Sequence, residues 1–335
     1  MAQITISAVA IAAAAPILAP VFTFTRGSVA AAGDPSPPPT TIGMPGCATS
    51  CGNVDVPYPF GIGADASCYL PGFILTCENN VGSSPRLLLD ADGTIQVFYI
   101  YNLHSGGYME VQRNGDVKID VDAHGNGKGT FSKGLRLDGP YMLHPFIRSE
   151  LILTGCNVEA TVKSGNVTVA SCTSLCDDTA DYEISLIDRC SGGSTGCCRA
   201  NIITPGYDDD GRSQVYSTGN TAYDVQLRRL FGWNRSAHRD RFPVHVFVAE
   251  RGWFDNTSVS NDLLQTHQPP SKETMAVPFV LTWEVVGHPN SNSVCKSNHR
   301  ERINGTRRGG YICLCKYGYQ GNPYLKDGCK GMYMS

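Results

Sequence analysis

The chain has 335 residues, a formal net charge of −3 and an ordinary hydrophobic fraction of 41%. This length accommodates two or three modules with real cores, and the near-neutral charge disfavours a nucleic-acid binder, which normally presents a basic face. The fourteen cysteines are a high, even number, which indicates a disulfide framework formed in an oxidising compartment.

The N-terminal segment predicts secretion. An Ala-rich apolar run at residues 8–22 precedes the small-residue stretch Val29-Ala-Ala-Ala32, a pattern typical of a signal peptide cleaved near Ala32, although no Lys or Arg precedes the run. Residues 33–46 are rich in proline and predict a linker. No later stretch reaches the roughly 18 apolar residues that a membrane span requires. We therefore expect a secreted protein of the extracellular space or cell wall, membrane-associated only in a longer isoform.

The next stretch, from Cys47 to Cys77, interleaves four cysteines with proline and glycine, so it needs covalent closure. It reads C-A-T-S-C-G-N-V-D-V-P-Y-P-F-G-I-G, followed by Cys68 and by F-I-L-T-C. This order resembles the cysteine-rich galacturonan-binding domain of plant wall-associated receptor kinases. The resemblance implies binding to de-esterified pectin. Tyr58 and Phe60 within this stretch are expected to be structural.

Two hairpins are predicted downstream. Two apolar, β-rich runs within residues 85–101 flank Asp92-Gly93, and residues 108–112 and 116–122 flank Asn114-Gly115. Both dipeptides tolerate the positive φ of a tight turn. The second run of this pair alternates apolar and charged residues as a half-buried strand does. The first domain is therefore expected to be mainly antiparallel β.

A second cysteine group occupies residues 151–203, and its pieces L-T-G-C-N, S-C-T-S-L-C and G-C-C again resemble the wall-associated kinase ectodomain. Because adjacent cysteines do not easily pair with each other, Cys197 and Cys198 are expected to have different partners. Cys172 and Cys176 have a spacing that zinc sites also use, but an oxidising compartment favours disulfides. The acidic run Asp208-Asp-Asp-Gly211 is interpreted as a solvated loop rather than a calcium loop.

Strands are predicted within residues 240–254, which contain an alternating segment, and within 278–285, which carry Trp283. After them, Y-I-C-L-C-K-Y-G-Y-Q-G-N-P-Y at residues 311–324, with Gly328-Cys329, resembles the second half of the same family's EGF-like repeat. A complete repeat has six cysteines, of which four are present, and Arg302 occupies the expected place of the third. By this resemblance the remaining pairs are Cys295–Cys313 and Cys315–Cys329.

No catalytic pattern stands out. The sequence lacks G-x-S-x-G, H-E-x-x-H, a Walker loop and the kinase motifs H-R-D and D-F-G, and its eight histidines show no metal-ligand spacing. No Asp/Glu pair is singled out for glycoside hydrolysis. We therefore expect a binding protein, with no enzymatic activity and no bound cofactor or metal, although calcium can bridge carboxylates to pectin.

The resemblance implies contact with a polyanion, but residues 33–155 carry seven basic and twelve acidic residues, which is no obvious polyanion surface. The residues from Lys296 to Lys330 are instead clearly positive, with eight basic residues against Glu301 and Asp327. Candidate contacts are cations that meet carboxylates and tyrosines that stack on sugar rings. They are Lys128, Lys133, Arg136, Arg86, Tyr99 and Tyr101.

Taken together, the sequence predicts a mainly β, disulfide-rich protein with antiparallel hairpins that binds pectin or oligogalacturonides. The alternative is a protein-interaction module, a decoy or co-receptor for receptor ectodomains or secreted peptides. The expected divisions are residues 1–32 (signal peptide), 33–46 (linker), 47–150 (galacturonan-binding-like domain), 151–285 (second cysteine-rich region) and 291–330 (EGF-like remnant). Glycosylation is expected at Asn166, Asn234, Asn256 and Asn304. The disulfide cysteines are Cys47, Cys51, Cys68, Cys77, Cys156, Cys172, Cys176, Cys190, Cys197, Cys198, Cys295, Cys313, Cys315 and Cys329.

Overall fold

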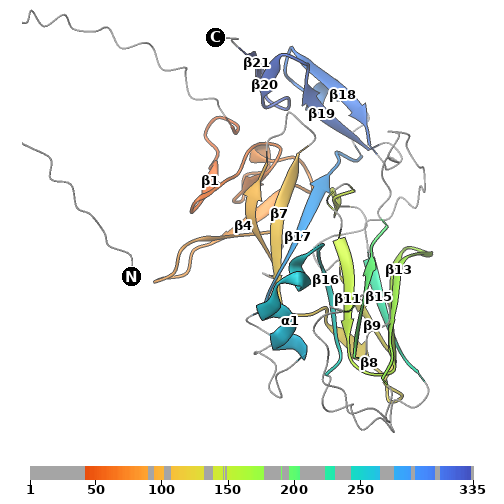
Figure 1. The fold of residues 1–335 in the computed structure, drawn as a ribbon. Helices are drawn as coiled ribbons and strands as arrows, with labels where there is room; N and C mark the ends of the chain where they lie inside the picture. Colours follow the sequence, from red (N-terminus) through yellow and green to blue (C-terminus); the bar gives the residue numbers. More distant parts are fainter. Residues whose placement is uncertain are drawn as a thin grey trace, which may run out of the picture. The chain divides into compact units, whose positions relative to one another are not determined.

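Strands make up most of the regular structure in the computed structural model, so the predicted mainly β, disulfide-rich fold class is confirmed (Figure 1). All described residues belong to one compact unit, Thr40–Ser335. No helix in the described ranges combines the length and apolar character that crossing a bilayer requires. The structure describes residues 42–89, 94–101, 107–131, 139–145, 147, 149–176, 190, 196–203, 223–230, 243–264, 275–287, 291–305 and 310–332.

The largest sheet has seven strands in the order β10-β17-β7-β6-β5-β4-β3, antiparallel except for the pair β3–β4. Its central strands are rich in β-branched and aromatic residues, which suit a half-buried pleated surface. The sheet's core face carries Leu87, Val97, Val111 and Phe279, which lie side by side in the register. The strands are β3 Gly61–Ile62, β4 Ile74–Glu78, β5 Arg86–Leu88, β6 Ile95–Ile100, β7 Tyr108–Asn114, β10 Tyr141–Leu143 and β17 Ala276–Trp283.

Two further sheets complete the main body, and one continuous core contains buried side chains from all three. In β12, exposed or half-exposed Glu159, Thr161 and Lys163 alternate with buried residues, as expected for a strand with one solvated face. The five-stranded sheet has the order β13-β12-β15-β9-β8, and the three-stranded sheet β14-β11-β16. The strands are β8 Ile119–Val121, β9 Gly127–Thr130, β11 Ser149–Thr154, β12 Val158–Ser164, β13 Val167–Ser174, β14 Cys197–Asn201, β15 Tyr223–Arg229 and β16 His245–Glu250.

These sheets take strands from both sides of residue 150. β17 lies between β10 and β7 in the seven-stranded sheet, whereas β8 and β9 extend the sheet formed by β12, β13 and β15. The regions 47–150 and 151–285 therefore share their sheets, and the division between them stays a prediction.

One predicted hairpin is confirmed and the other is wrong. β5 and β6 pair antiparallel, with Leu87 opposite Val97, while Asp92-Gly93 lies outside the described residues. Gly115 does have a positive φ of 78°, but β7 does not pair with β8. Both edges of β7 are already occupied, by β6 and by β17. Asn114-Gly115 therefore begins a crossover to the other sheet.

The strand predicted within residues 240–254 forms as β16, but its expected alternation is wrong. Val246 and Val248 enter the main core, whereas Phe247 and Ala249 enter a second cluster. That cluster also contains Phe254, from the 3₁₀ helix η5 (Trp253–Asp255), and Leu263, from α1 (Thr257–Leu264). Because these elements cover the face that would otherwise be solvated, both faces of β16 are buried.

All fourteen cysteines are paired, and the expected pairs Cys295–Cys313 and Cys315–Cys329 are present. Cys197 and Cys198 have different partners, as predicted. Cys172 and Cys176, weighed as zinc ligands, are both disulfide-bonded. The other pairs are Cys47–Cys68, Cys51–Cys77, Cys156–Cys176, Cys172–Cys198 and Cys190–Cys197.

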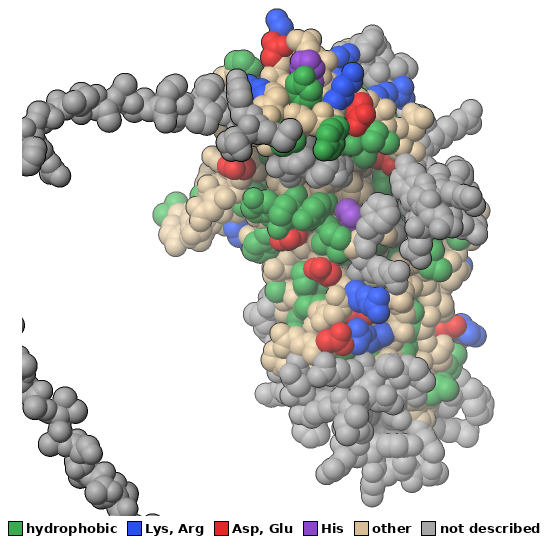
Figure 2. All heavy atoms as spheres, turned by 45° about the horizontal axis from the view of Figure 1, so that its top comes forward, with side chains coloured by type: hydrophobic (Ala, Val, Ile, Leu, Met, Phe, Trp, Pro, Cys, Tyr) green, Lys and Arg blue, Asp and Glu red, His purple; other side chains and the backbone are tan. Residues whose placement is uncertain are grey.

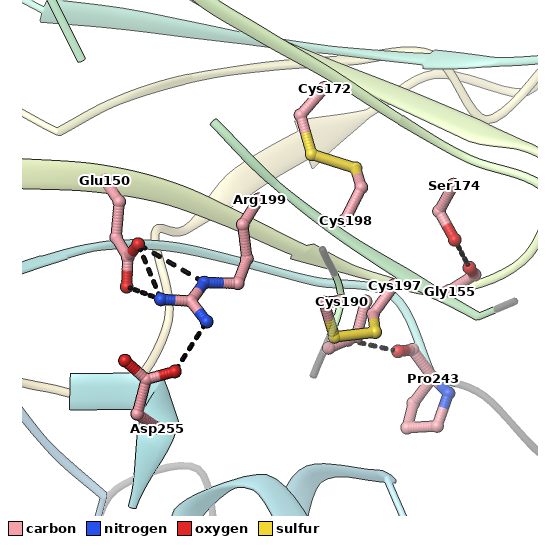
Figure 3. The surroundings of a disulfide bond; sticks show 11 residues. Glu150, Gly155, Cys172, Ser174, Cys190, Cys197, Cys198, Arg199, Pro243 and Asp255 are labelled. Atoms are coloured by element: carbon pink, nitrogen blue, oxygen red, sulfur yellow. Dashed lines mark hydrogen bonds and ion pairs between the residues drawn. A yellow bond between two sulfur atoms is a disulfide. The ribbon is translucent and has the colours of Figure 1, made fainter. Parts of the chain in front are cut away.

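Figure 3 shows two of these bonds, of which Cys172–Cys198 ties two sheets of the main body together. Cys172–Cys198 joins β13 to β14, so it links the five-stranded sheet to the three-stranded one. Beside them Arg199 forms a multiple ion pair with Glu150 (Nη2–Oε1 and Nη2–Oε2 both 2.9 Å), and its Nη1 lies 2.7 Å from Asp255 Oδ1. This network joins β14, β11 and η5.

The C-terminal module consists of two small ribbons, β18–β19 and β20–β21. It shares the main core through Tyr311, Cys313 and Tyr324, and Asn322 Nδ2 donates to the backbone oxygens of Ile42 and Tyr58. The module is therefore packed onto the first cysteine-rich stretch. The remaining elements are β1 Ser50–Cys51, β2 Val54–Asp55, η1 Ala66–Cys68, α2 Ser291–Val294, β18 Arg300–Asn304, β19 Tyr311–Cys315, β20 Tyr319–Gly321 and β21 Cys329–Gly331.

Candidate ligand-binding surface

The structure brings three of the six candidate contacts to one surface. Since Val97 and Val111 face the core, the register places Tyr99, Tyr101 and Arg86 on the opposite, solvent face of the seven-stranded sheet. Lys128 lies in the other large sheet, and Lys133 and Arg136 lie outside the described residues. Tyr58 and Phe60 are buried, with exposed fractions of 4% and 1%, so their predicted structural role is confirmed.

The surface is built around a row of stacked rings, which we call the aromatic row: Tyr99, Tyr101, Tyr108 and His144. The ring centroids lie 4.2 Å apart for Tyr99–Tyr101, 4.2 Å for Tyr101–Tyr108 and 5.7 Å for Tyr108–His144. Tyr99 lies in β6 and Tyr108 in β7, while Tyr101 directly follows β6 and His144 directly follows β10. Tyr99 is 52% exposed and the neighbouring Phe98 is 45% exposed, so the row offers an apolar face to a ligand.

A β-bulge positions the row. The register between β6 and β7 shifts between Val97 and Tyr99, so Phe98 has no partner in the ladder and Tyr99 lies opposite Glu110. From there the alternation brings Tyr101 beside Tyr108, whose backbone oxygen accepts from Tyr101 N at 2.8 Å. Bulges redirect side chains in this way and are frequent at functional surfaces. Sequence reasoning missed Tyr108, Glu110 and His144, because an unknown register hides which residues are neighbours.

The aromatic row has a carboxylate group, that of Glu110, next to it. Tyr101 Oη donates to Glu110 Oε1 at 2.8 Å, and this hydrogen bond is the main reason that the pKa of Tyr101 is raised to about 12. Burial, and then the charge of Glu110, raise the pKa of Glu250. Figure 2 shows hydrophobic and acidic side chains next to one another across the middle of the displayed face. The surface therefore combines ring faces with hydrogen-bond acceptors, and its local charge is negative.

The two described cations among the candidates are less available than the sequence suggests. Arg86 pairs with Glu78, with Nη2 2.6 Å from Oε2, so its charge is largely compensated. Lys128 lies between Asp120 and Gln226 in the cross-strand register. It lines a groove of about 620 Å³ together with Arg228 and Arg229, of which Arg228 pairs with Glu159 at 2.6 Å. This groove has mixed charge.

Protonation of His144, the last ring of the aromatic row, makes the stability of the fold depend on pH. Burial lowers its pKa from 6.5 to about 4, and its Nδ1 accepts from Ile147 N at 2.9 Å, which requires the neutral ring. Since the folded-state pKa lies below the unfolded value, this group stabilises the fold above pH 6.5, and the contribution is lost as the pH falls toward 4. We expect the melting temperature of His144→Asn, which keeps an acceptor but does not titrate, to fall less over this range than that of the wild type. Equal slopes would contradict this assignment.

The three described sequon asparagines, Asn166, Asn256 and Asn304, are all exposed, whereas Asn234 lies outside the described residues. Asn166 is in the two-residue turn between β12 and β13, Asn256 directly precedes α1 and Asn304 ends β18. Their side chains are therefore accessible to a glycosylating enzyme. Among the residues that the structure describes, no group of three or more His, Cys, Asp or Glu gathers as a metal site.

A disulfide-stapled, mainly β fold with exposed sequons and a solvent-facing aromatic row is typical of an extracellular module. Residues 47–112 match the family model "Wall-associated receptor kinase galacturonan-binding". The chain is homologous to wall-associated receptor kinases over about 85% of its length. The resemblance seen in the sequence is therefore confirmed, and the matched part of the chain corresponds to the ectodomain of these proteins.

Individual relatives show how far this similarity extends. Wall-associated receptor kinase 3 of Arabidopsis thaliana is 29% identical over 301 residues, which cover 85% of this chain and 35% of that protein. Wall-associated receptor kinase 1 of the same plant is 28% identical over 298 residues, covering 85% and 34%, and wall-associated receptor kinase-like 6 is 25% identical over 301 residues, covering 84% and 44%. The chain thus spans about a third of the length of the first two relatives. No solved structure gives a significant match.

Proposed function

We propose that this chain binds galacturonan of the plant cell wall outside the cell, as a non-catalytic receptor-like ectodomain. The observation that carries this proposal is that Tyr99, Tyr101, Tyr108 and Glu110 all lie within residues 47–112, the segment that matches the galacturonan-binding family. An exposed ligand surface and a family match therefore coincide in one stretch of the chain.

The chemistry of the row suits a sugar polymer. The C–H faces of pyranose rings pack on exposed aromatic rings, and Tyr99 and Tyr101 present two such rings 4.2 Å apart. Glu110 uses one carboxylate oxygen to accept from Tyr101, and its other oxygen is placed to accept from a sugar hydroxyl. Stacking would thus supply affinity, while the carboxylate would fix the orientation of the sugar.

Secretion and glycosylation belong to the same proposal. Seven disulfides form and persist in an oxidising compartment, and the exposed sequons are sites for N-glycans. The predicted signal peptide, residues 1–32, and residues 33–41 of the predicted linker (33–46) lie outside the described residues.

A protein-interaction role is the second candidate, and the acidic character of the row favours it. Glu110, which lies opposite exposed Tyr99, and Glu250, which is close enough to Glu110 for that charge to raise its pKa, would also suit a basic peptide whose apolar side chains pack on the rings. Salt would weaken a complex of a basic peptide with the acidic row, and it would also weaken a polyanion complex held by cations elsewhere on the chain, so salt sensitivity alone does not separate these functions. The two functions are separated by a competition experiment, in which a basic peptide and an oligogalacturonide compete for the aromatic row.

The test is a calorimetric titration of the glycosylated chain with oligogalacturonides, with and without calcium, at two salt concentrations. We expect saturable binding that the double variant Tyr99→Ala/Tyr101→Ala weakens roughly tenfold or more, since stacked aromatic contacts contribute about 0.5–1.5 kcal/mol each beyond their buried area. Tyr101→Phe is the matched control, because it keeps the ring and loses only the bond to Glu110. Absence of binding by the folded wild-type protein under every condition would exclude the proposal.

A further inference from the structure

The C-terminal module has a surface that is distinct from the aromatic row and opposite in charge. Five of its cations are exposed: Lys296, Arg302, Lys316, Lys326 and Lys330. Figure 2 shows Lys and Arg side chains gathered at this end of the molecule around a histidine. In the described residues no ion pair engages Lys316, Lys326 or Lys330, unlike Arg86, whose charge Glu78 compensates at 2.6 Å.

Aromatic rings lie among these cations. The ring of His299 stacks on that of Tyr319, with centroids 4.0 Å apart and planes 13° apart. The neighbouring Tyr317 is fully exposed, with a relative accessibility of 102%. Backbone hydrogen bonds from Lys316 N to His299 O and from Tyr319 N to Lys316 O hold these residues in one turn. We call His299, Lys316, Tyr317 and Tyr319, together with Lys330 of β21, which pairs with β20, the basic turn surface.

The module that carries this surface is fixed to the rest of the protein. Val285 and Tyr311 exchange backbone hydrogen bonds of 2.8 and 3.1 Å, and Lys296 Nζ lies 5.3 Å from the ring centroid of Tyr58. Two disulfides, Cys295–Cys313 and Cys315–Cys329, cross-link the module. The turn is therefore presented by a braced scaffold, which reduces the conformational entropy lost on binding.

Exposed cations next to an unburied tyrosine fit an anionic carbohydrate polymer. Residues 296–330 carry eight basic and two acidic residues, whereas residues 33–155 carry seven and twelve. A polymer of ionised uronic acids would therefore be attracted to the basic residues 296–330 and repelled by the acidic residues 33–155. Lysine ammonium groups meet its carboxylates as point charges, while a flat ring packs on the sugar.

We propose that the basic turn surface is a second binding site, which supplies the electrostatic contact to de-esterified galacturonan. This inference rests on the proposed function and extends it, because it adds charge recognition on the C-terminal module to the sugar stacking on the aromatic row. Uronic acids whose carboxyl groups are methyl-esterified carry no charge, so they lose the contact at the basic turn surface and keep the stacking.

The experiment compares two double variants with the same loss of charge, each titrated with a de-esterified oligogalacturonide at low and high salt. Lys316→Gln/Lys330→Gln is expected to lower the affinity about tenfold at low salt and to reduce its salt dependence, since attraction between exposed charges is screened by ions. Lys118→Gln/Lys163→Gln, on the other large sheet, is expected to change the affinity less than threefold. Tyr317→Ala tests the ring separately and should weaken binding at both salt concentrations.

The outcomes separate this inference from the proposed function. An equal loss in both lysine variants would show that only net charge matters, and undiminished binding by the Lys316/Lys330 variant would exclude the second site. In either case, wild-type binding that still requires Tyr99 and Tyr101 would leave the aromatic row as the site. If the wild type binds a methyl-esterified oligomer as tightly as the de-esterified one at low salt, the electrostatic contact is absent and the inference fails.

Discussion

Replacing Arg199 by alanine is expected to lower the free energy of unfolding by about 3–5 kcal/mol, because it leaves a buried carboxylate without its partner. Glu150 is only 3% exposed, and it accepts three hydrogen bonds of 2.9–3.2 Å from Arg199. Without the guanidinium, its charge would be compensated only by Gly252 N at 3.4 Å. The melting temperature of the oxidised protein at neutral pH is the measurement.

Arg228→Ala is the matched control for this prediction. Arg228 also pairs with a glutamate, at 2.6 Å from Glu159, but its side chain is 67% exposed. Water replaces such a pair easily, so we expect a loss of about 1 kcal/mol or less. A second comparison is Glu150→Leu/Arg199→Met, which removes both charges and should recover much of the stability. Equal effects of the two Arg→Ala variants would contradict the burial argument.

Replacing Asn322 by alanine is expected to lower the free energy of unfolding by roughly 3 kcal/mol and to loosen the C-terminal module, because it removes the hydrogen-bond partner of the buried Tyr58 oxygen and of the Tyr324 N–H. Its Nδ2 donates to Ile42 O at 3.2 Å and to Tyr58 O, while its Oδ1 accepts from Tyr324 N at 3.0 Å. The side chain is 6% exposed, so water does not readily replace it.

Hydrogen exchange locates this effect as well as measuring it. Tyr58 N, which donates to Ile42 O at 2.8 Å, should exchange faster in Asn322→Ala before the main sheets do, since local opening exposes it. The control is Asn298→Ala, whose exposed amide donates to Asp327 at 2.7 Å and whose loss should change little. Uniform acceleration of exchange across all sheets would instead indicate that the module does not open separately.

Much of the covalent framework was predictable from local signals. Cysteine number and spacing, with the family resemblance, predicted the disulfide class and both C-terminal pairs, and two apolar, β-rich runs around a turn dipeptide predicted the pairing of β5 with β6. One further local signal is the dipeptide Gly165-Asn166, which forms the tight turn between β12 and β13, with Gly165 at a φ of 59°. Asn166 enters the sequence predictions only as a glycosylation site.

What the sequence determined by itself was therefore chemistry that stays close along the chain: which cysteines must be closed, which runs are strands and which segments are acidic or basic. Tertiary structure decided the rest. Asn114-Gly115 is a crossover because β6 and β17 already occupy both edges of β7, and β17 comes from 160 residues or more further along the chain. The aromatic row depends on a bulge at Phe98 and on a histidine that directly follows a third strand. Strand partners and register are set by long-range packing, which local sequence patterns do not encode.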